Sequence, residues 1–224
     1  MLAESPRLTN RLTAVLMAGS CLAVGALAVR VHRTGSMWFA FMIWNLVLAV
    51  VPFCFALVLH LRWQRQRRVS AGLVLLSLGW LLFFPNAPYV LTDVVHLGND
   101  RLWWYDLPLV MAFAGTSWLA GLMSLDLVDD VLTQAVSRNF ARGVVLASCW
   151  LSGMGVYLGR FLRFNSWDVA RSPRALTITA LQKFLPPWKH PQPHAFALFF
   201  AVLLLGSYMT FRMLRANECY ASPR

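Results

Sequence analysis

The chain has 224 residues, of which 58% are hydrophobic and 13% are charged, and its net charge is +11. About a quarter of the residues of a typical soluble domain are charged, so this composition excludes an ordinary soluble domain and indicates a polytopic membrane protein. The basic residues are spread over the ends of apolar segments and no soluble binding module is visible, which argues against nucleic-acid binding and makes membrane lipids the expected partners.

Six apolar segments are long enough, or nearly long enough, to cross a bilayer as helices, which takes about 20 residues. They are Leu12–Val29, Met37–Leu61, Ala71–Phe84, Leu107–Val128, Val144–Leu158 and Ala195–Phe211. We therefore predict an all-α, multi-pass protein with about six transmembrane helices, forming a single membrane domain over residues 1–224. The first segment is predicted to be an uncleaved helix, because its apolar run is longer than that of a signal peptide.

The orientation follows from the short loop with four closely spaced arginines, Arg62, Arg65, Arg67 and Arg68. The positive-inside rule places this loop in the cytoplasm, together with both termini and a predicted loop over 126–142. Asp129 and Asp130 are accordingly interpreted as loop solvation and a helix cap. None of the four cysteines is expected to form a disulfide, because Cys21, Cys54 and Cys149 lie within apolar segments.

The third segment is too short to span the bilayer if it stops at Phe84. We predict a kink at Pro85–Pro88 and a half-helix that continues to about Leu97, with Asn86 as its cap. Before the sixth segment, a long connection predicted to lie outside contains one apolar stripe typical of an interfacial helix. The stripe consists of Leu176, Ala180, Leu181, Phe184 and Leu185.

Tyr89, Asp93 and His96 are spaced i, i+4, i+7 on the half-helix, and Asp100 would extend the same face. A polar stripe beside lipid is expected to face protein or a wet cavity. Asp93 and His96 can form an acid–base pair or provide two metal ligands, so they are the candidate catalytic residues. The alternative is a solvated loop helix, and the sequence identifies neither a metal nor a cofactor.

A second polar string follows the fifth segment, where Arg160 and Arg163 precede Asn165-Ser166-Trp167-Asp168. Two guanidinium groups suit a phosphate or carboxylate ligand, and Asp168 can pair with either arginine. Anchoring of arginine and tryptophan at the lipid interface is the alternative. We predict that Arg163 and Asp168 lie within reach of the stripe on the half-helix.

Two further features support a shared site. Ser152, Gly155 and Gly159 give the fifth segment a smooth face for close packing. Asp106 is expected to be the N-cap of the fourth segment, with Pro108 in the first turn, and can also face the site. The candidate ligand-binding residues are Asn86, Tyr89, Asp106, Arg160, Arg163, Asn165 and Asp168.

Residues 85–97, Trp104-Tyr105-Asp106 and 159–168 together resemble the motifs of a bacterial multi-pass membrane family known as domain of unknown function 1361. The resemblance covers most of the chain and is strongest between Leu81 and Asp168. It implies a bacterial integral membrane protein and brings no activity with it.

We expect a membrane protein with an outward-facing interfacial pocket that handles an anionic or lipid-linked ligand, with or without catalysis. One alternative is a non-catalytic lipid-binding or membrane assembly protein, in which the same charges lock helix ends together. A small-solute transporter is a third, less favoured alternative, because the sequence contains no internal repeat.

Overall fold

A computed structural model of the chain describes residues 5–98, 102–164, 166–186 and 188–221. This part of the chain is helical and contains no strand, which confirms the predicted all-α class. The elements are α1 (Ser5–Thr34), α2 (Phe41–Gln66), α3 (Ala71–Phe83), α4 (Asn86–Tyr89), the 3₁₀ helix η1 (Val90–His96), α5 (Trp103–Ala135), α6 (Arg138–Leu162), α7 (Asp168–Arg171), α8 (Pro173–Phe184) and α9 (Pro191–Ala221).

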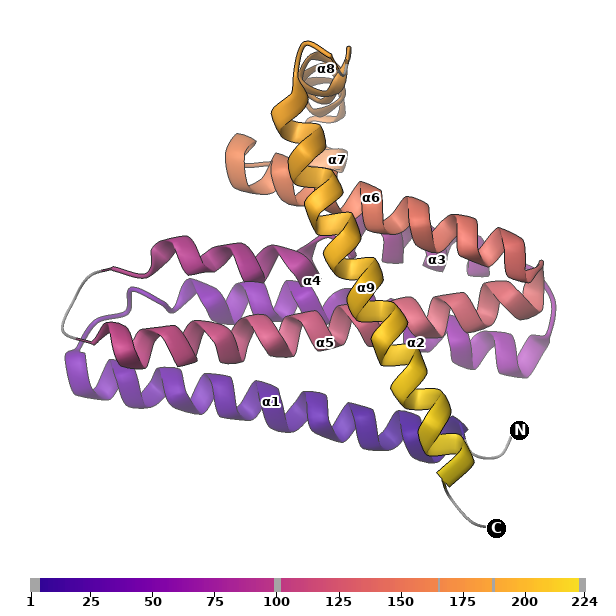
Figure 1. Cartoon of the computed structure of the whole chain (residues 1–224), viewed down its shortest axis with the longest axis horizontal. Coiled ribbons are helices and arrows are strands. Elements are labelled where there is room, and N and C mark those ends of the chain that lie inside the picture. Colours follow the sequence, from indigo (N-terminus) through magenta and orange to yellow (C-terminus); the bar gives the residue numbers. More distant parts are fainter. Residues whose placement is uncertain (1–4, 99–101, 165, 187, 222–224) are drawn as a thin grey trace.

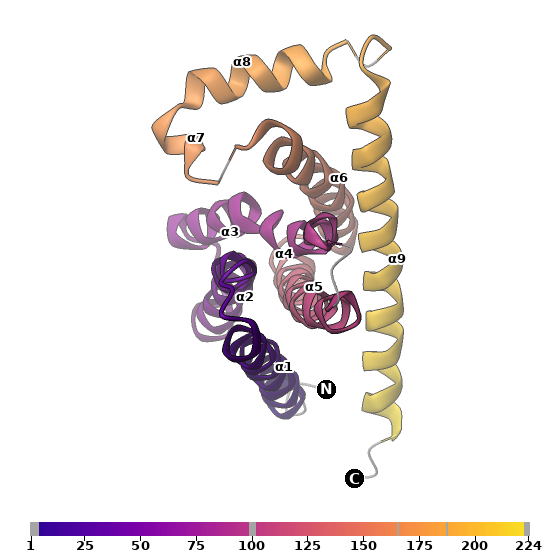
Figure 2. The same ribbon diagram turned by 90° about the vertical axis from the view of Figure 1, so that its left-hand side faces the viewer.

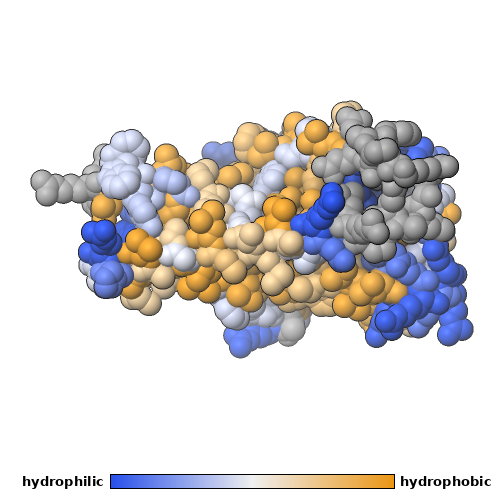
Figure 3. Space-filling view, turned by 90° about the horizontal axis from the view of Figure 1, so that it is seen from below, coloured by the Kyte–Doolittle hydropathy of each residue, from blue (hydrophilic) through white to orange (hydrophobic). Residues whose placement is uncertain are grey.

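Six stretches of the described chain are long and apolar enough to cross a membrane. They are Asn10–Thr34, Phe41–Gln66, Ala71–His96, Trp103–Ala135, Arg138–Leu162 and Pro191–Ala216. Each overlaps one predicted segment and extends beyond it at one end or both, although the second span begins at Phe41, after the predicted start at Met37. The space-filling view shows apolar side chains in the middle of one face and hydrophilic ones at both of its ends (Figure 3). The protein is therefore a multi-pass membrane protein.

Helix α5 is the centre of the bundle and contacts α1, α2, α4, η1, α6 and α9. It is also the most buried of the six candidate spans. Helix α9 crosses the other long helices obliquely, and α8 lies across the end of α6 (Figures 1 and 2). Both chain termini lie at the same end of the bundle (Figure 1). We call this end the Asp129 end, and the opposite one, where α6 finishes, the Asp93 end.

The glycine face of α6 permits close packing, as the sequence predicted. A Cβ atom on Gly155 would lie 2.7 Å from the Pro85 ring, and one on Gly159 would lie 3.1 Å from the ring of Tyr89. On the neighbouring turn, a Cβ on Gly153 would lie 2.5 Å from the carbonyl oxygen of Ala197 in α9. The missing side chains thus bring α6 against both the kinked third span and α9.

The third span is kinked at the predicted prolines, but the second half is not a regular α-helix. Only one α turn (α4) follows Pro85, and the chain then tightens into the 3₁₀ helix η1. The Thr92 hydroxyl donates to the Tyr89 carbonyl, 2.6 Å away, which fits the tighter turn. The predicted cap is wrong: Pro85 holds the N-cap position, and the Asn86 amide instead donates to the Phe83 carbonyl.

The predicted boundaries of the fourth segment are also wrong. Helix α5 begins at Trp103, so Asp106 lies inside its first turn and Leu102 holds the N-cap position. At its other end α5 continues to Ala135, and α6 starts at Arg138. The predicted loop over 126–142 is therefore almost entirely helical. Both predicted boundaries of this segment lie too far inside the helix, because α5 continues through polar residues beyond the apolar core of the span.

Candidate functional site

At the Asp93 end, the side chain of Arg160 contacts four residues of the kinked third span. Its Nη2 donates to Asp93 Oδ1 at 2.5 Å and its Nε to Thr92 Oγ1 at 2.8 Å. Its Nη1 lies 3.1 Å from His96 Nε2, and the guanidinium carbon is 4.7 Å from the centre of the Tyr89 ring. We call these five residues the Arg160 cluster.

The 3₁₀ geometry of η1 explains how one guanidinium reaches so many side chains. With three residues per turn, residues i and i+3 eclipse, so Tyr89 and Thr92 form one row and Asp93 and His96 form another about 120° away. Arg160 lies between the two rows, with its face on the aromatic ring and its N–H groups directed to the polar atoms. The cluster therefore depends on the break after Pro85.

Asp93 is almost completely buried, with 1% of its surface exposed. Its Oδ1 accepts from Arg160, and its Oδ2 accepts from the Asn45 amide of α2 at 2.8 Å. Burial of a charge is tolerated only with such pairing, so the carboxylate links α2, η1 and α6. Since a guanidinium can only donate, Nε2 of His96 is the acceptor in its contact with Arg160. The His96 ring packs edge-on against Phe41 at 5.0 Å.

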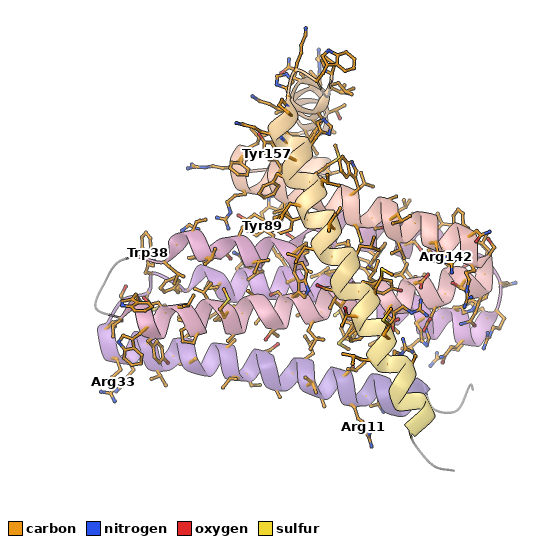
Figure 4. All side chains as sticks on the ribbon, viewed as in Figure 1. Arg11, Arg33, Trp38, Tyr89, Arg142 and Tyr157 are labelled. Atoms are coloured by element: carbon orange, nitrogen blue, oxygen red, sulfur yellow. The ribbon has the colours of Figure 1, made fainter. Side chains whose placement is uncertain are left out.

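A cavity of about 430 Å³ lies beside the Arg160 cluster. We call it the outer cavity. Its polar lining comes from Asn45, Asn86, Tyr89 and Ser166, and Asn86 donates to the Ser166 hydroxyl at 3.0 Å. The rest of its wall is mainly apolar and consists of Trp44, Leu48, Leu78, Leu81, Leu82, Pro85, Leu151, Gly155, Leu158, Gly159, Phe164, Val169 and Leu176. Tyr89, one of the polar lining residues, lies near the end of α6 (Figure 4).

The outer cavity opens on the apolar surface of the bundle. Trp44, Leu78 and Leu151 line it and yet expose 56%, 57% and 45% of their surfaces. Such residues would face acyl chains in a bilayer. Helices α7 and α8 contribute Val169 and Leu176 to the wall, so the connection predicted to contain an interfacial helix borders the cavity.

The structure brings together some of the predicted site residues and separates others. Tyr89, Asp93, His96 and Arg160 meet in one cluster, and Asn86 lines the adjoining cavity. Asn165 and Asp100 lie outside the described residues. Arg163 is exposed and has the left-handed conformation (φ 59°) that ends α6, so of the two predicted arginines only Arg160 belongs to the cluster. Asp168 is half-buried at the start of α7.

Asp106 belongs to a different pair. Its carboxylate accepts two hydrogen bonds from the Arg30 guanidinium of α1, at 2.5 and 2.9 Å, and both side chains are buried. The Arg30 group also lies 4.6 Å from the centre of the Phe39 ring. This second ion pair fastens α1 to the beginning of α5 and is separate from the Arg160 cluster.

Sequence reasoning missed Asn45, Thr92 and Ser166 at the site. Asn45 was detectable, since an isolated amide within an apolar span needs a polar partner. Thr92 and Ser166 carried no such signal, because hydroxyl groups are readily satisfied by nearby backbone carbonyls. Within the described residues, no group of three His, Cys, Asp or Glu side chains is arranged to hold a metal ion.

Comparison with known families places the chain in context. The model of a family described as protein of unknown function (DUF1361) matches residues 44–206, which is most of the chain. The Arg160 cluster, Asn45 and the lining of the outer cavity all fall within the matched residues. Arg30 lies outside them. No curated protein and no solved structure gives a significant match.

Proposed function

The chain belongs to the DUF1361 family, and we propose that it binds an anionic lipid or lipid-linked molecule in the outer cavity, with the Arg160 cluster as the rigid frame of that cavity. The observation that carries this proposal is the two-part lining of the cavity, apolar over most of its wall and polar around Asn45, Asn86, Tyr89 and Ser166. An amphipathic ligand fits such a lining, because acyl carbons and a head group need opposite surroundings.

The position of the cavity supports a ligand that arrives from the bilayer. Leu78, Leu82 and Leu151 line it and are exposed on the surface that would face lipid. A chain could therefore enter sideways between α3 and α6, without leaving the apolar phase. The proposed topology places the Asp93 end outside and the termini in the cytoplasm, in agreement with the basic loop over 62–68.

Charge near the cavity favours an anionic head group. The positive charge of Arg160 is matched by Asp93, so it is not available to a ligand. Three exposed arginines flank lining residues along the chain: Arg163 precedes Phe164, and Arg171 and Arg174 lie between Val169 and Leu176. Exposed guanidinium groups near an apolar site are well suited to a phosphate.

A binding role accounts for the geometry of Asp93 better than catalysis does. Both of its carboxylate oxygens hold hydrogen bonds to Arg160 and Asn45, and only 1% of the residue is exposed. A general base must reach a proton of the substrate, which here would require one of these bonds to break. The assignment of Asp93 and His96 as base or metal ligands stays a prediction.

The test is to fill the cavity and measure lipid retention. Leu78→Trp adds an indole at the cavity wall. Leu75→Trp adds the same group one turn away in α3, at a residue that is 68% exposed and does not line the cavity. Native mass spectrometry of the purified full-length protein should show that Leu78→Trp retains one anionic lipid fewer than the wild type, whereas Leu75→Trp retains as many as the wild type. Equal retention by both variants would refute the proposal.

A further inference from the structure

A second cavity lies at the opposite end of the bundle, between α5, α6 and α9. Its volume is about 700 Å³, and we call it the inner cavity. It is lined by Asp129, Asp130, Thr133, Gln134, Arg138, Arg142, Val145, Leu146, Leu205, Tyr208, Met209 and Arg212. In Figure 4, Arg142 lies toward the turn between α5 and α6, far along the bundle from Tyr89. The inner cavity is therefore distinct from the outer one.

Three aspartates on one face of α5 are paired with α9, and two of them, Asp129 and Asp130, line this cavity. Arg212 forms ion pairs with Asp126, Asp129 and Asp130, and Arg215 forms ion pairs with Asp126 and Asp130. The interpretation of Asp129 and Asp130 as loop solvation and a cap is thus wrong. They lie inside α5, where the spacing i, i+3, i+4 turns the three carboxylates toward α9.

Arg138 and Arg142 remain outside this network. Both are exposed on the first turns of α6, line the inner cavity, and have no ion pair with a described residue. The charges around the cavity are three carboxylates against five guanidinium groups, because Arg67 also donates to the lining residue Gln134 at 2.7 Å. The carboxylates are Asp126, Asp129 and Asp130, and the other arginines are Arg138, Arg142, Arg212 and Arg215. The excess charge is positive, which favours an anionic phosphate group.

The apolar part of the inner cavity continues from these arginines toward the middle of the bundle. Arg142 and Leu146 are one turn apart on α6, and Val145 extends the same wall. Leu146 and Met209 line the cavity and expose 54% and 52% of their surfaces, so this wall also opens on the lipid-facing side. A lipid in a bilayer leaflet has the same arrangement, with its phosphate at the end of the bundle and its acyl carbons deeper along α6.

We propose that the inner cavity is a binding site for an anionic phospholipid, whose phosphate is held by Arg138 and Arg142 and whose acyl chains pack on Val145, Leu146, Leu205 and Met209. The lipid belongs to the leaflet at the Asp129 end, which the proposed topology makes the cytoplasmic leaflet. This site does not depend on the outer cavity.

The experiment uses the full-length chain in neutral detergent, carrying Leu78→Trp so that the outer cavity does not contribute. The thermal unfolding midpoint is measured during titration with phosphatidylglycerol, phosphatidylcholine or inorganic phosphate. Phosphatidylglycerol should raise the midpoint, and Arg138→Gln/Arg142→Gln should weaken its apparent affinity about thirtyfold, as expected for two lipid-facing arginines.

The matched control is Arg65→Gln/Arg68→Gln, which removes two exposed charges at the same end of the bundle but outside the cavity. This variant should respond to phosphatidylglycerol as the parent does, and all variants should unfold at the same midpoint in phosphatidylcholine. Equal loss in both double variants, an equal response to phosphatidylcholine, or full reproduction by inorganic phosphate would overturn the proposal. If only the Leu78→Trp test of the outer cavity failed, the proposal for the inner cavity would still hold.

Discussion

The guanidinium group of Arg160 lies 2.5 Å from the carboxylate of Asp93, although 67 positions separate the two residues. This ion pair joins the end of α6 to the 3₁₀ helix that follows the proline kink. Asn45 extends it to α2. Three elements from different parts of the chain therefore meet at a single buried carboxylate.

Arg160→Gln should lower the free energy of unfolding by about 3 to 5 kcal/mol, because it leaves the buried Asp93 carboxylate without its cation. Chemical unfolding in detergent micelles, followed by tryptophan fluorescence, measures the loss. Arg163→Gln is the control, because Arg163 is exposed and its substitution should change the free energy of unfolding only slightly. The double variant Asp93→Asn/Arg160→Gln should be more stable than the sum of the single changes predicts. Strict additivity would contradict the pairing.

Gly155→Ala should destabilise the protein, because the new methyl group would lie 2.7 Å from the Pro85 ring. Gly143→Ala is the matched change on the same helix, where nothing lies within 4 Å of the added carbon. There the better helix propensity of alanine should stabilise the protein by up to about 1 kcal/mol. Thermal unfolding of the two variants should shift in opposite directions, and a shift in the same direction would argue against close packing at Pro85.

Arg212→Gln should destabilise the contact between α5 and α9 by about 1 to 3 kcal/mol, because three carboxylates would then face Arg215 alone. Asp129→Asn alone should lower the stability of this contact less, because it leaves two carboxylates paired with two guanidinium groups. Adding Asp129→Asn to Arg212→Gln should restore part of the lost stability. Hydrogen exchange of the α9 amides reports on this contact, and no restoration would refute the proposed charge balance.

Arg163→Gln should weaken retention of the anionic ligand proposed for the outer cavity, since Arg163 is exposed next to the lining residue Phe164. Arg33→Gln removes an exposed arginine at the same end of the bundle, away from the cavity (Figure 4), and should retain the ligand. The lipid that co-purifies with each variant is quantified by mass spectrometry. Similar losses from both variants would indicate general charge attraction rather than a site.

Arg163→Cys should react with a membrane-impermeant maleimide in intact cells, whereas Arg65→Cys should react only after lysis. Both variants are made in a chain whose native cysteines are replaced. The expectation follows from the basic loop over 62–68, which the positive-inside rule places in the cytoplasm. The reverse labelling pattern would invert the topology and exchange the leaflets of the two proposed lipid sites.

The sequence by itself determined the all-helical fold, the six spans and the kink at Pro85–Pro88, because length, hydropathy and proline act locally along the chain. It also indicated that Tyr89, Asp93 and His96 face inward. A polar stripe in a membrane helix has few other places to go, since unpaired polar groups are costly in hydrocarbon.

Only the tertiary structure decided which partners these residues meet. Arg160 rather than Arg163 reaches Asp93, because α6 ends at Leu162 and the left-handed residue Arg163 is exposed. Asp106 pairs with Arg30, and Asp129 with Arg212, because α5 extends beyond its apolar run at both ends. Partner choice depends on how each helix is rotated about its axis and which helices are neighbours, and the packing of the whole bundle sets both.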